Sequence, residues 1–205
     1  SFHLPLFLRA HRIKSRAAMN QQYRSELLEI LVRESYVERE VTLSSGKKSD
    51  YYLDCRRAIF LPRAAFLAGE LMLELMVAAG VEQLGGMAVA AIPVTDAIIA
   101  AAYRHGVNLR GFFVRKETKA HGLQQRIEGA FRPGLKTAVL DDAITTGGST
   151  LEALACVREA GAVVSAAMTL VERGEGGAEA FAREGLAYSW ILTGGEIRAA
   201  ARARG

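Results

Sequence analysis

Residues 137–150 read TAVLDDAITTGGST, and this stretch carries most of the information about the fold. An apolar strand at 137–142 ends in two adjacent acids, and a loop of Thr, Gly and Ser then opens a helix near Leu151. Glycines let main-chain N–H groups approach an anion, and hydroxyl side chains add donors beside the positive end of the helix dipole. The stretch therefore predicts a phosphate-binding turn between a strand and a helix.

This predicted turn lacks the Lys of a GxxxxGK[ST] nucleotide loop, so we expect a phosphate monoester rather than the β- or γ-phosphate of ATP. Its two acids, Asp141 and Asp142, repel each other by about 1 kcal/mol at contact distance even in water. They need hydroxyl donors or a cation nearby, and ribose hydroxyls are such donors. A helix capped by Ser or Thr would explain the glycines but not the paired acids.

The rest of the chain alternates short apolar runs with helical segments. We expect strands at 85–93 (GGMAVAAIP), 111–115, 137–142, 163–171 and 188–192, and helices at 94–106, 149–161 and 178–185. Such alternation indicates right-handed crossovers and a doubly wound, mostly parallel sheet of the α/β class. Ahead of it we expect a helix around Tyr23, two extended pieces flanking the turn SSGKKSD at 44–50, and a helix from Pro62 to Gly80.

The length of 205 residues suits one domain, which we place at 19–205, with residues 1–18 as a basic extension. We expect this extension to be disordered or to reflect a non-native start, with a targeting peptide as the alternative. Its apolar stretch at 4–8 is too short to span a membrane. Cys55 and Cys156 form no zinc or disulfide pattern, so a cytoplasmic location is expected.

The positive charge of the chain lies in the extension and not in the body. Lys and Arg exceed Asp and Glu by four, 26 against 22. The four basic residues Arg9, Arg12, Lys14 and Arg16 account for that whole excess. A nucleic-acid-binding surface should be clustered on the folded domain, so we expect no nucleic-acid partner.

A second informative segment, FFVRKETKAHGLQQRIEG at 112–129, is rich in cations. Arg115, Lys116, Lys119, His121 and Arg126 are accompanied there by only two acids, Glu117 and Glu128. A solvated loop is one interpretation. The other is a mobile segment that closes over a departing pyrophosphate, neutralises its charge and excludes water.

These features resemble the type I phosphoribosyltransferases, whose motif for phosphoribosyl pyrophosphate (PRPP) is an apolar strand, two acids and a T-x-G-type loop. RKETKAHG at 115–122 resembles the catalytic loop of the orotate phosphoribosyltransferase family, RKExKxHG. VTLSSGKKSDYYLD at 41–54 is similar to that family's TLxSGxxSxYY segment. The resemblance covers about residues 21–196 and implies the type I phosphoribosyltransferase fold with a small N-terminal hood segment.

The resemblance implies transfer of the 5-phosphoribosyl group from PRPP to orotate, giving orotidine 5′-monophosphate and pyrophosphate, in pyrimidine biosynthesis. The sugar would become oxocarbenium-like as pyrophosphate leaves, so no covalent nucleophile is expected. Mg²⁺ is the implied cofactor, held mainly by substrate oxygens and water. A homodimer with shared active sites is implied, because part of the family's loop reaches a neighbouring subunit, and no membrane partner is expected.

The resemblance also assigns residues to the binding of PRPP. Catalytic roles fall to Lys119, Asp141 and Asp142. The PRPP-binding set is Arg115, Lys116, Lys119, His121, Asp141, Asp142, Ala143, Ile144, Thr145, Thr146, Gly147, Gly148, Ser149 and Ala90, the last through its backbone.

The orotate-binding set implied by the resemblance is Tyr52, Leu53, Thr145 and Arg173. The planar guanidinium of Arg173 suits the carboxylate of the base. Its neighbourhood, GEGG at 174–177, is not a dinucleotide fingerprint, because the third glycine position of GxGxxG falls on Glu179. At Ser44 the family often has Lys, so that contact is either missing or supplied by Lys47 or Lys48.

Two other functions stay open from the sequence. A phosphoribosyltransferase for a purine or uracil would keep the phosphate turn, but we do not expect it to carry RKETKAHG together with Arg173. A non-catalytic regulator that senses PRPP could dispense with the cationic loop. It should bring a DNA-binding module, and the helical residues ahead of the first strand are too few for a winged helix.

Overall fold

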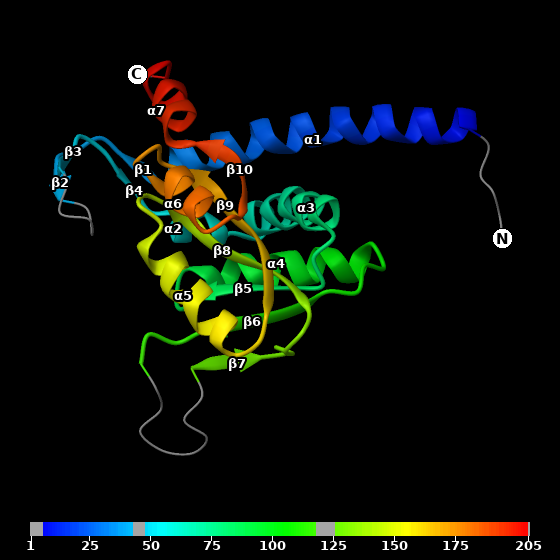
Figure 1. Ribbon diagram of the computed structural model, residues 1–205. Coiled ribbons are helices and arrows are strands. Elements are labelled where there is room, and N and C mark those ends of the chain that lie inside the picture. Colours follow the sequence, from blue (N-terminus) through cyan, green and yellow to red (C-terminus); the bar gives the residue numbers. More distant parts are fainter. Residues whose placement is uncertain (1–5, 43–47, 118–125, 205) are drawn as a thin grey trace.

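The computed structural model describes residues 6–42, 48–117 and 126–204, and its centre is a six-stranded sheet in the order β10-β9-β8-β5-β6-β7 (Figure 1). The strands are β5 (Gln83–Met87), β6 (Arg110–Val114), β7 (Ile127–Gly129), β8 (Lys136–Ile144), β9 (Val163–Glu172) and β10 (Ala187–Thr193). β7 pairs antiparallel with β6, and all other neighbours are parallel. The predicted doubly wound, mostly parallel sheet is confirmed.

Helices cover both faces of this sheet (Figure 1). They are α1 (Leu6–Glu34), α2 (Cys55–Ile59), α3 (Pro62–Ala79), α4 (Ala91–Arg104), α5 (Gly148–Glu159), α6 (Gly177–Arg183) and α7 (Gly194–Arg202). In β8, Ala138 and Leu140 belong to the buried cluster shared with α1, α3 and α4, whereas Val139 belongs to the cluster shared with α5 and α6. Successive strand residues thus fill two cores, which explains the continuous apolar runs of the sequence.

The hood segment consists of two short antiparallel pairs outside the main sheet. β1 (Tyr36–Val37) pairs with β4 (Tyr52–Leu53), and β2 (Val41–Thr42) pairs with β3 (Lys48–Ser49). The two extended pieces predicted here are confirmed in part: β1 and β2 lie in the first and β4 in the second, but β3 falls within the turn predicted at 44–50. The helix predicted from Pro62 is confirmed as well, and Gly80 ends it in the left-handed conformation that terminates many helices.

The predicted strand at 85–93 is wrong in its second half. β5 ends at Met87, and α4 begins at Ala91 with Pro93 in its first turn. Ala91, Val94 and Ile98 of α4 are buried, so the apolar run continues from a buried strand into a buried helix. Periodicity cannot separate the two in such a short run. The correction places a turn at 88–90, directly beyond the carboxyl end of β5.

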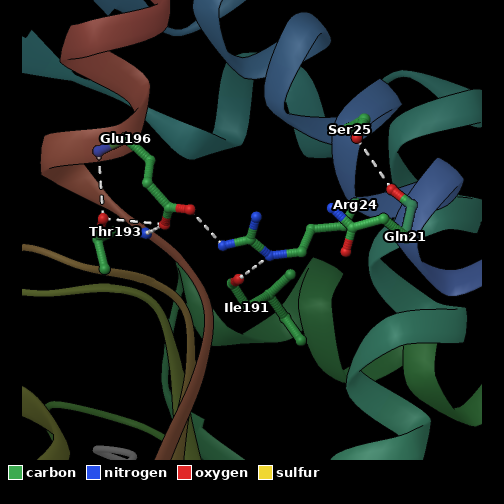
Figure 2. A network of polar contacts seen from close by, with 6 residues as sticks. All are labelled: Gln21, Arg24, Ser25, Ile191, Thr193 and Glu196. Carbon is green, nitrogen blue, oxygen red and sulfur yellow. Dashed lines mark hydrogen bonds and ion pairs between the residues drawn. The ribbon is translucent and has the colours of Figure 1, made fainter. Parts of the chain in front are cut away.

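α7 was not predicted, although its start carries a recognisable signal. Thr193 and Glu196 form a capping box, in which each side chain accepts a hydrogen bond from the main-chain N–H of the other. Figure 2 shows that Arg24 of α1 joins this box: its Nη2 lies 2.5 Å from the Glu196 carboxylate, and its Nε donates to the Ile191 carbonyl at 3.0 Å. α7 is therefore fixed against both the sheet and α1.

Residues 6–18 of the predicted basic extension are helical and continuous with the rest of α1. The division of the chain at residue 18 stays a prediction. Among the helices that the structure describes, none has the length and apolar character needed to cross a membrane.

Candidate active site

A pocket of about 970 Å³ opens beyond the carboxyl ends of the central strands, β5 and β8. The strand order reverses between these two, because β6 and β7 continue on one side and β9 and β10 on the other. Ligands of doubly wound sheets bind at such a point, where the loops that leave the two strands diverge. The lining residues are Arg39, Val41, Tyr52, Leu53, Asp54, Arg56, Ala90, Lys116, Asp142, Ala143, Ile144, Thr145, Thr146, Gly147, Gly148, Ser149, Glu152 and Arg173.

Most of the predicted site residues that the structure describes meet in this pocket. Asp141 and Arg115 are the exceptions, since neither lines it. The Arg115 side chain instead pairs with Glu128 at 3.1 Å. Lys119 and His121 lie outside the described residues, as do Ser44 and Lys47.

The turn between β8 and α5 presents main-chain groups to the pocket. Gly147 precedes the first turn of α5 with φ 83°, a left-handed conformation that favours glycine, and a Cβ there would lie 3.0 Å from the Phe181 ring. Gly147 has no side chain to cap the helix, so the N–H groups of the first turn are not consumed by a capping side chain. Gly148 and Ser149 of that turn line the pocket. The positive end of the helix dipole therefore faces the space where an anion would bind.

The two adjacent acids at the end of β8 are both buried, with exposed fractions of 6% for Asp141 and 8% for Asp142. The Asp141 carboxylate accepts hydrogen bonds from the Asp142 N–H at 3.0 Å and the Ser149 hydroxyl at 2.9 Å. The Asp142 carboxylate accepts one from the Ala143 N–H at 2.8 Å and lines the pocket. Asp141 is thus held within the protein, whereas Asp142 faces the ligand space.

Burial raises the pKa of both carboxyls, because it disfavours their charged forms. The charge of Asp142 raises the pKa of Asp141 further, and the hydrogen bond from Ser149 opposes this rise. A hydrogen bond from the Ala143 N–H and the charge of Arg56 oppose the rise at Asp142. The charged form of this pair is unfavourable in the unliganded protein, and a ligand with hydroxyl donors or positive charge would stabilise it.

Arg173 reaches the pocket from the residue that follows β9. Its side chain is only 4% exposed, and its guanidinium carbon lies 4.3 Å from the centre of the Tyr51 ring. Glu175 lies 3.4 Å from Nη2 of the same side chain. The main-chain N–H of Arg173 donates to the Ile144 carbonyl at 2.9 Å, which joins this loop to the end of β8. A fixed, nearly buried guanidinium at this place can bind a planar carboxylate.

The hood, and helix α2 that follows it, contribute charged residues that the sequence interpretation missed. Asp54 caps α2 and receives two hydrogen bonds from the Arg56 guanidinium, at 2.7 and 3.0 Å, which hold the pKa of Asp54 below its usual range. Arg39 lies with its guanidinium carbon 5.3 Å from the centre of the Tyr52 ring. Lys48, one of the two lysines predicted to replace the family's Lys at Ser44, pairs with Glu40 at 2.9 Å and does not line the pocket.

A doubly wound sheet with a hood, and a glycine- and hydroxyl-rich turn beside paired acids at its switch point, are features of a type I phosphoribosyltransferase. The chain is 42% identical over 173 residues to an orotate phosphoribosyltransferase of Rhodopirellula baltica, covering 82% of this chain and 90% of the relative. It is 44% identical over 175 residues to that of Corynebacterium glutamicum, covering 85% and 94%. The chain belongs to the orotate phosphoribosyltransferase family, and it is an enzyme of the glycosyltransferase type.

Solved structures agree with this assignment. The structure of the Mycobacterium tuberculosis orotate phosphoribosyltransferase in complex with PRPP superposes with a TM-score of 0.73 at 38% identity, covering 85% of this chain and 98% of that one. No model of a known protein family matches the chain. Of the functions left open by the sequence, family membership favours the orotate enzyme over a transferase for another base and over a regulator.

Proposed function

We propose that this pocket binds PRPP and orotate and forms orotidine 5′-monophosphate. The observation that carries the proposal is the meeting, around one pocket, of the β8–α5 turn, the Asp142 carboxylate and the nearly buried Arg173 guanidinium. These groups suit a phosphate monoester, ribose hydroxyls and a carboxylate, respectively. The complex of the Mycobacterium tuberculosis relative with PRPP supports the donor.

The 5′-phosphate would bind at the β8–α5 turn. Main-chain N–H groups at 145–149 and the hydroxyls of Thr145, Thr146 and Ser149 would donate to its oxygens. Asp142 would accept hydrogen bonds from the ribose hydroxyls, and its raised pKa would return toward the ordinary range as these donors arrive. Asp141 would not contact the donor directly. Its carboxylate would position the ligand-binding groups, because it accepts hydrogen bonds from the Ser149 hydroxyl and the Asp142 N–H.

Orotate would lie between the hood and the loop that follows β9. Tyr52 and Leu53 would contact its ring, Thr145 would contact its polar edge, and Arg173 would bind its carboxylate. The bond from C1 of the sugar to pyrophosphate breaks, and the electron pair leaves with pyrophosphate. A ring nitrogen of orotate would form the new bond to C1, and the proton of that nitrogen would pass to the departing pyrophosphate.

Pyrophosphate would depart toward the cationic segment. Lys116 lines the pocket, and Ala90 offers backbone groups from the turn beyond β5. By resemblance, Arg115, Lys119 and His121 would join Lys116. Arg115 would first have to exchange its partner Glu128 for the leaving group. Positive charge at this side stabilises the negative charge that develops as the bond to C1 loosens.

The pocket fits a Mg²⁺ ion that keeps most of its ligands from substrate and water. In the described part of the chain, no group of three or more His, Cys, Asp or Glu side chains is gathered to hold a metal. Asp142 offers one buried carboxylate at the pocket, which suits an ion bound mainly through substrate oxygens. When bound, Mg²⁺ supplies charge neutralisation at the leaving group.

A homodimer with shared active sites and a cytoplasmic location complete the proposal. The support for the dimer is the resemblance of RKETKAHG to a loop that reaches a neighbouring subunit. Sedimentation of the purified chain, and activity of mixtures of two differently inactivated variants, test it. Recovery of activity on mixing is expected only if one subunit completes the site of the other.

The function itself is tested by the absorbance of orotate. We expect the purified chain to consume orotate on addition of PRPP and Mg²⁺ and to release pyrophosphate in equal amount, and Lys119→Ala to lose most of this activity. Parallel reactions contain uracil or adenine in place of orotate. Consumption of one of these bases with orotate untouched would overturn the assignment of the base, and no consumption of any base would overturn the assignment of an enzyme.

A further inference from the structure

Two successive tyrosines of the hood, Tyr51 just before β4 and Tyr52 at its start, have different surroundings. Tyr52 is half-buried and lines the pocket. Tyr51 is only 8% exposed and does not line the pocket. Tyr51 therefore cannot serve as a wall of the base site in the way that Tyr52 can, and its place in the structure needs another explanation.

The Tyr51 ring lies directly against the guanidinium of Arg173. The distance from the guanidinium carbon to the ring centre is 4.3 Å, within the range of about 6 Å in which a cation is attracted to an aromatic face. This attraction is strongest when the pair is desolvated, and both side chains are nearly buried. The Arg173 guanidinium thus packs on the face of the Tyr51 ring, and Arg173 also lines the pocket.

The ring of Tyr51 is in turn held by its surroundings. Tyr36 stacks on it with ring centres 5.5 Å apart and an angle of 28° between the planes. At the start of α7, a Cβ on Gly194 would lie 2.5 Å from the Tyr51 hydroxyl oxygen and 3.3 Å from Cδ of Arg173. Gly194 thus allows α7 to approach both side chains closely, and the capping box at Thr193 fixes where α7 begins.

We propose that Tyr51 is a positioning residue that holds the Arg173 guanidinium in the orientation that binds the carboxylate of orotate. This inference rests on the proposed function, in which Arg173 contacts that carboxylate. An Arg side chain loses rotamer freedom when it is fixed, and this loss opposes binding. Where the protein has already fixed the side chain, binding orotate does not carry that cost.

The test is a comparison of Michaelis constants. We expect Tyr51→Leu to raise KM for orotate about tenfold, because an apolar side chain fills the space but has no π-face for the guanidinium. KM for PRPP and kcat should change less than about twofold. Tyr51→Phe, which keeps the ring but removes the hydroxyl that also interacts with Arg173, should restore most of the KM for orotate, and Gly194→Ala should raise KM by crowding Tyr51 and Arg173.

The control is Tyr23→Leu, which removes a ring that packs on Phe66 of α3 and does not line the pocket. It should leave KM for orotate unchanged, and melting temperatures show whether each variant is folded. Should Tyr51→Leu melt below the assay temperature, Tyr51→Met takes its place in the series. An unchanged KM for orotate in a folded variant without the ring, or an equal rise in both Michaelis constants, would overturn the inference.

Arg173→Ala separates failure of this inference from failure of the proposed function. If Arg173→Ala leaves KM for orotate unchanged, the role proposed for Arg173 is wrong. If Arg173→Ala raises KM but Tyr51→Leu does not, only the role of Tyr51 is wrong. In the double variant, loss of the Tyr51 ring should add nothing to the effect of Arg173→Ala, because Tyr51 acts through Arg173.

Discussion

The neighbouring parallel strands β8 and β9 both carry buried acids near their carboxyl ends, but these acids differ in their hydrogen-bond partners. In register, Ile144 at the end of β8 pairs with Glu172 at the end of β9. The Glu172 carboxylate accepts hydrogen bonds from the Gly174 N–H at 2.7 Å and from the Tyr188 hydroxyl. Asp141 and Asp142 crowd each other instead, and burial raises the pKa of both.

This difference in hydrogen-bond partners shows that burial alone does not identify an acid that binds a ligand. Glu172 is satisfied within the protein, and it shapes the loop from which Arg173 reaches the pocket. The Asp142 carboxylate faces the pocket with the Ala143 N–H as its main-chain donor. One strand end therefore stabilises the fold, whereas the other keeps unfavourable charge that a ligand can relieve. Four substitutions test this division, beginning with the largest expected effect.

Replacing the pocket-facing acid should abolish most of the activity without harm to the fold. We expect Asp142→Asn to lower kcat/KM about 100-fold, because hydrogen bonds to a charged group contribute about 1.5–3 kcal/mol. Its melting temperature should stay equal or rise, since a buried charge is removed. The loss of orotate absorbance and a thermal melt of the same sample measure both quantities. A variant that keeps activity, or that loses it only by unfolding, would contradict the division.

Replacing the acid of β9 should instead weaken the fold. We expect Glu172→Ala to lower the free energy of unfolding by about 2 kcal/mol, because the Gly174 N–H and the Tyr188 hydroxyl lose their acceptor. Urea unfolding measures the change. Glu172→Gln is the matched control: its amide oxygen can accept from the Gly174 N–H and its amide nitrogen can donate to the Tyr188 oxygen, so part of the stability should return. Equal stability of the Ala variant and the wild type would show that Glu172 has no such structural role.

Asp141 should make the stability of the unliganded protein depend on pH. Its pKa is raised in the folded chain, so the folded state binds the proton more tightly than the unfolded state does. The ordinary pKa of a carboxyl is about 4. The free energy of unfolding therefore falls as the pH rises from about 4 through the raised pKa of Asp141. We expect Asp141→Asn to be more stable than the wild type by about 1 kcal/mol at pH 8, with no gain at pH 4.

The control for this pH series is Asp96→Asn on α4, which changes an exposed carboxyl. Its difference from the wild type should not vary between pH 4 and pH 8. A gain for Asp141→Asn that is constant across the series would show that it comes from something other than the buried charge.

Local patterns predicted the parts of the site that come from one continuous segment. The strand end, the paired acids and the phosphate turn at 137–150 lie together in sequence, so their chemistry could be inferred before the fold was known. Asp142, residues 143–149 and Arg173 line the same pocket. Asp141 shows the limit of such inference: adjacent acids on a strand face opposite sides, and only one of them lines the pocket.

The parts that the sequence did not predict depend on contacts between distant segments. β7 is a three-residue strand at the edge of the sheet, and it pairs antiparallel with β6. Three residues are too few to show the alternating pattern by which a strand is recognised in a sequence. The surroundings of Tyr51 could not be predicted, because Arg173 and Gly194, which approach it closely, come from distant parts of the chain. α7 could have been found from Thr193 and Glu196, which carry the spacing of a capping box.

The cations of the hood and of α2 also differ in whether another side chain pairs with them, and Arg39 gives the smallest expected effect. Arg56 and Arg39 both line the pocket, but the Arg56 guanidinium is paired with Asp54, whereas Arg39 forms no ion pair among the described residues. We expect Arg39→Ala to raise KM for PRPP about threefold at low salt, and the effect to shrink at 0.5 M salt, because exposed charges are screened. Arg57→Ala, an exposed neighbour that does not line the pocket, is the control. If both variants respond alike, the effect belongs to the net charge of the hood, and Arg39 has no specific part in binding the donor.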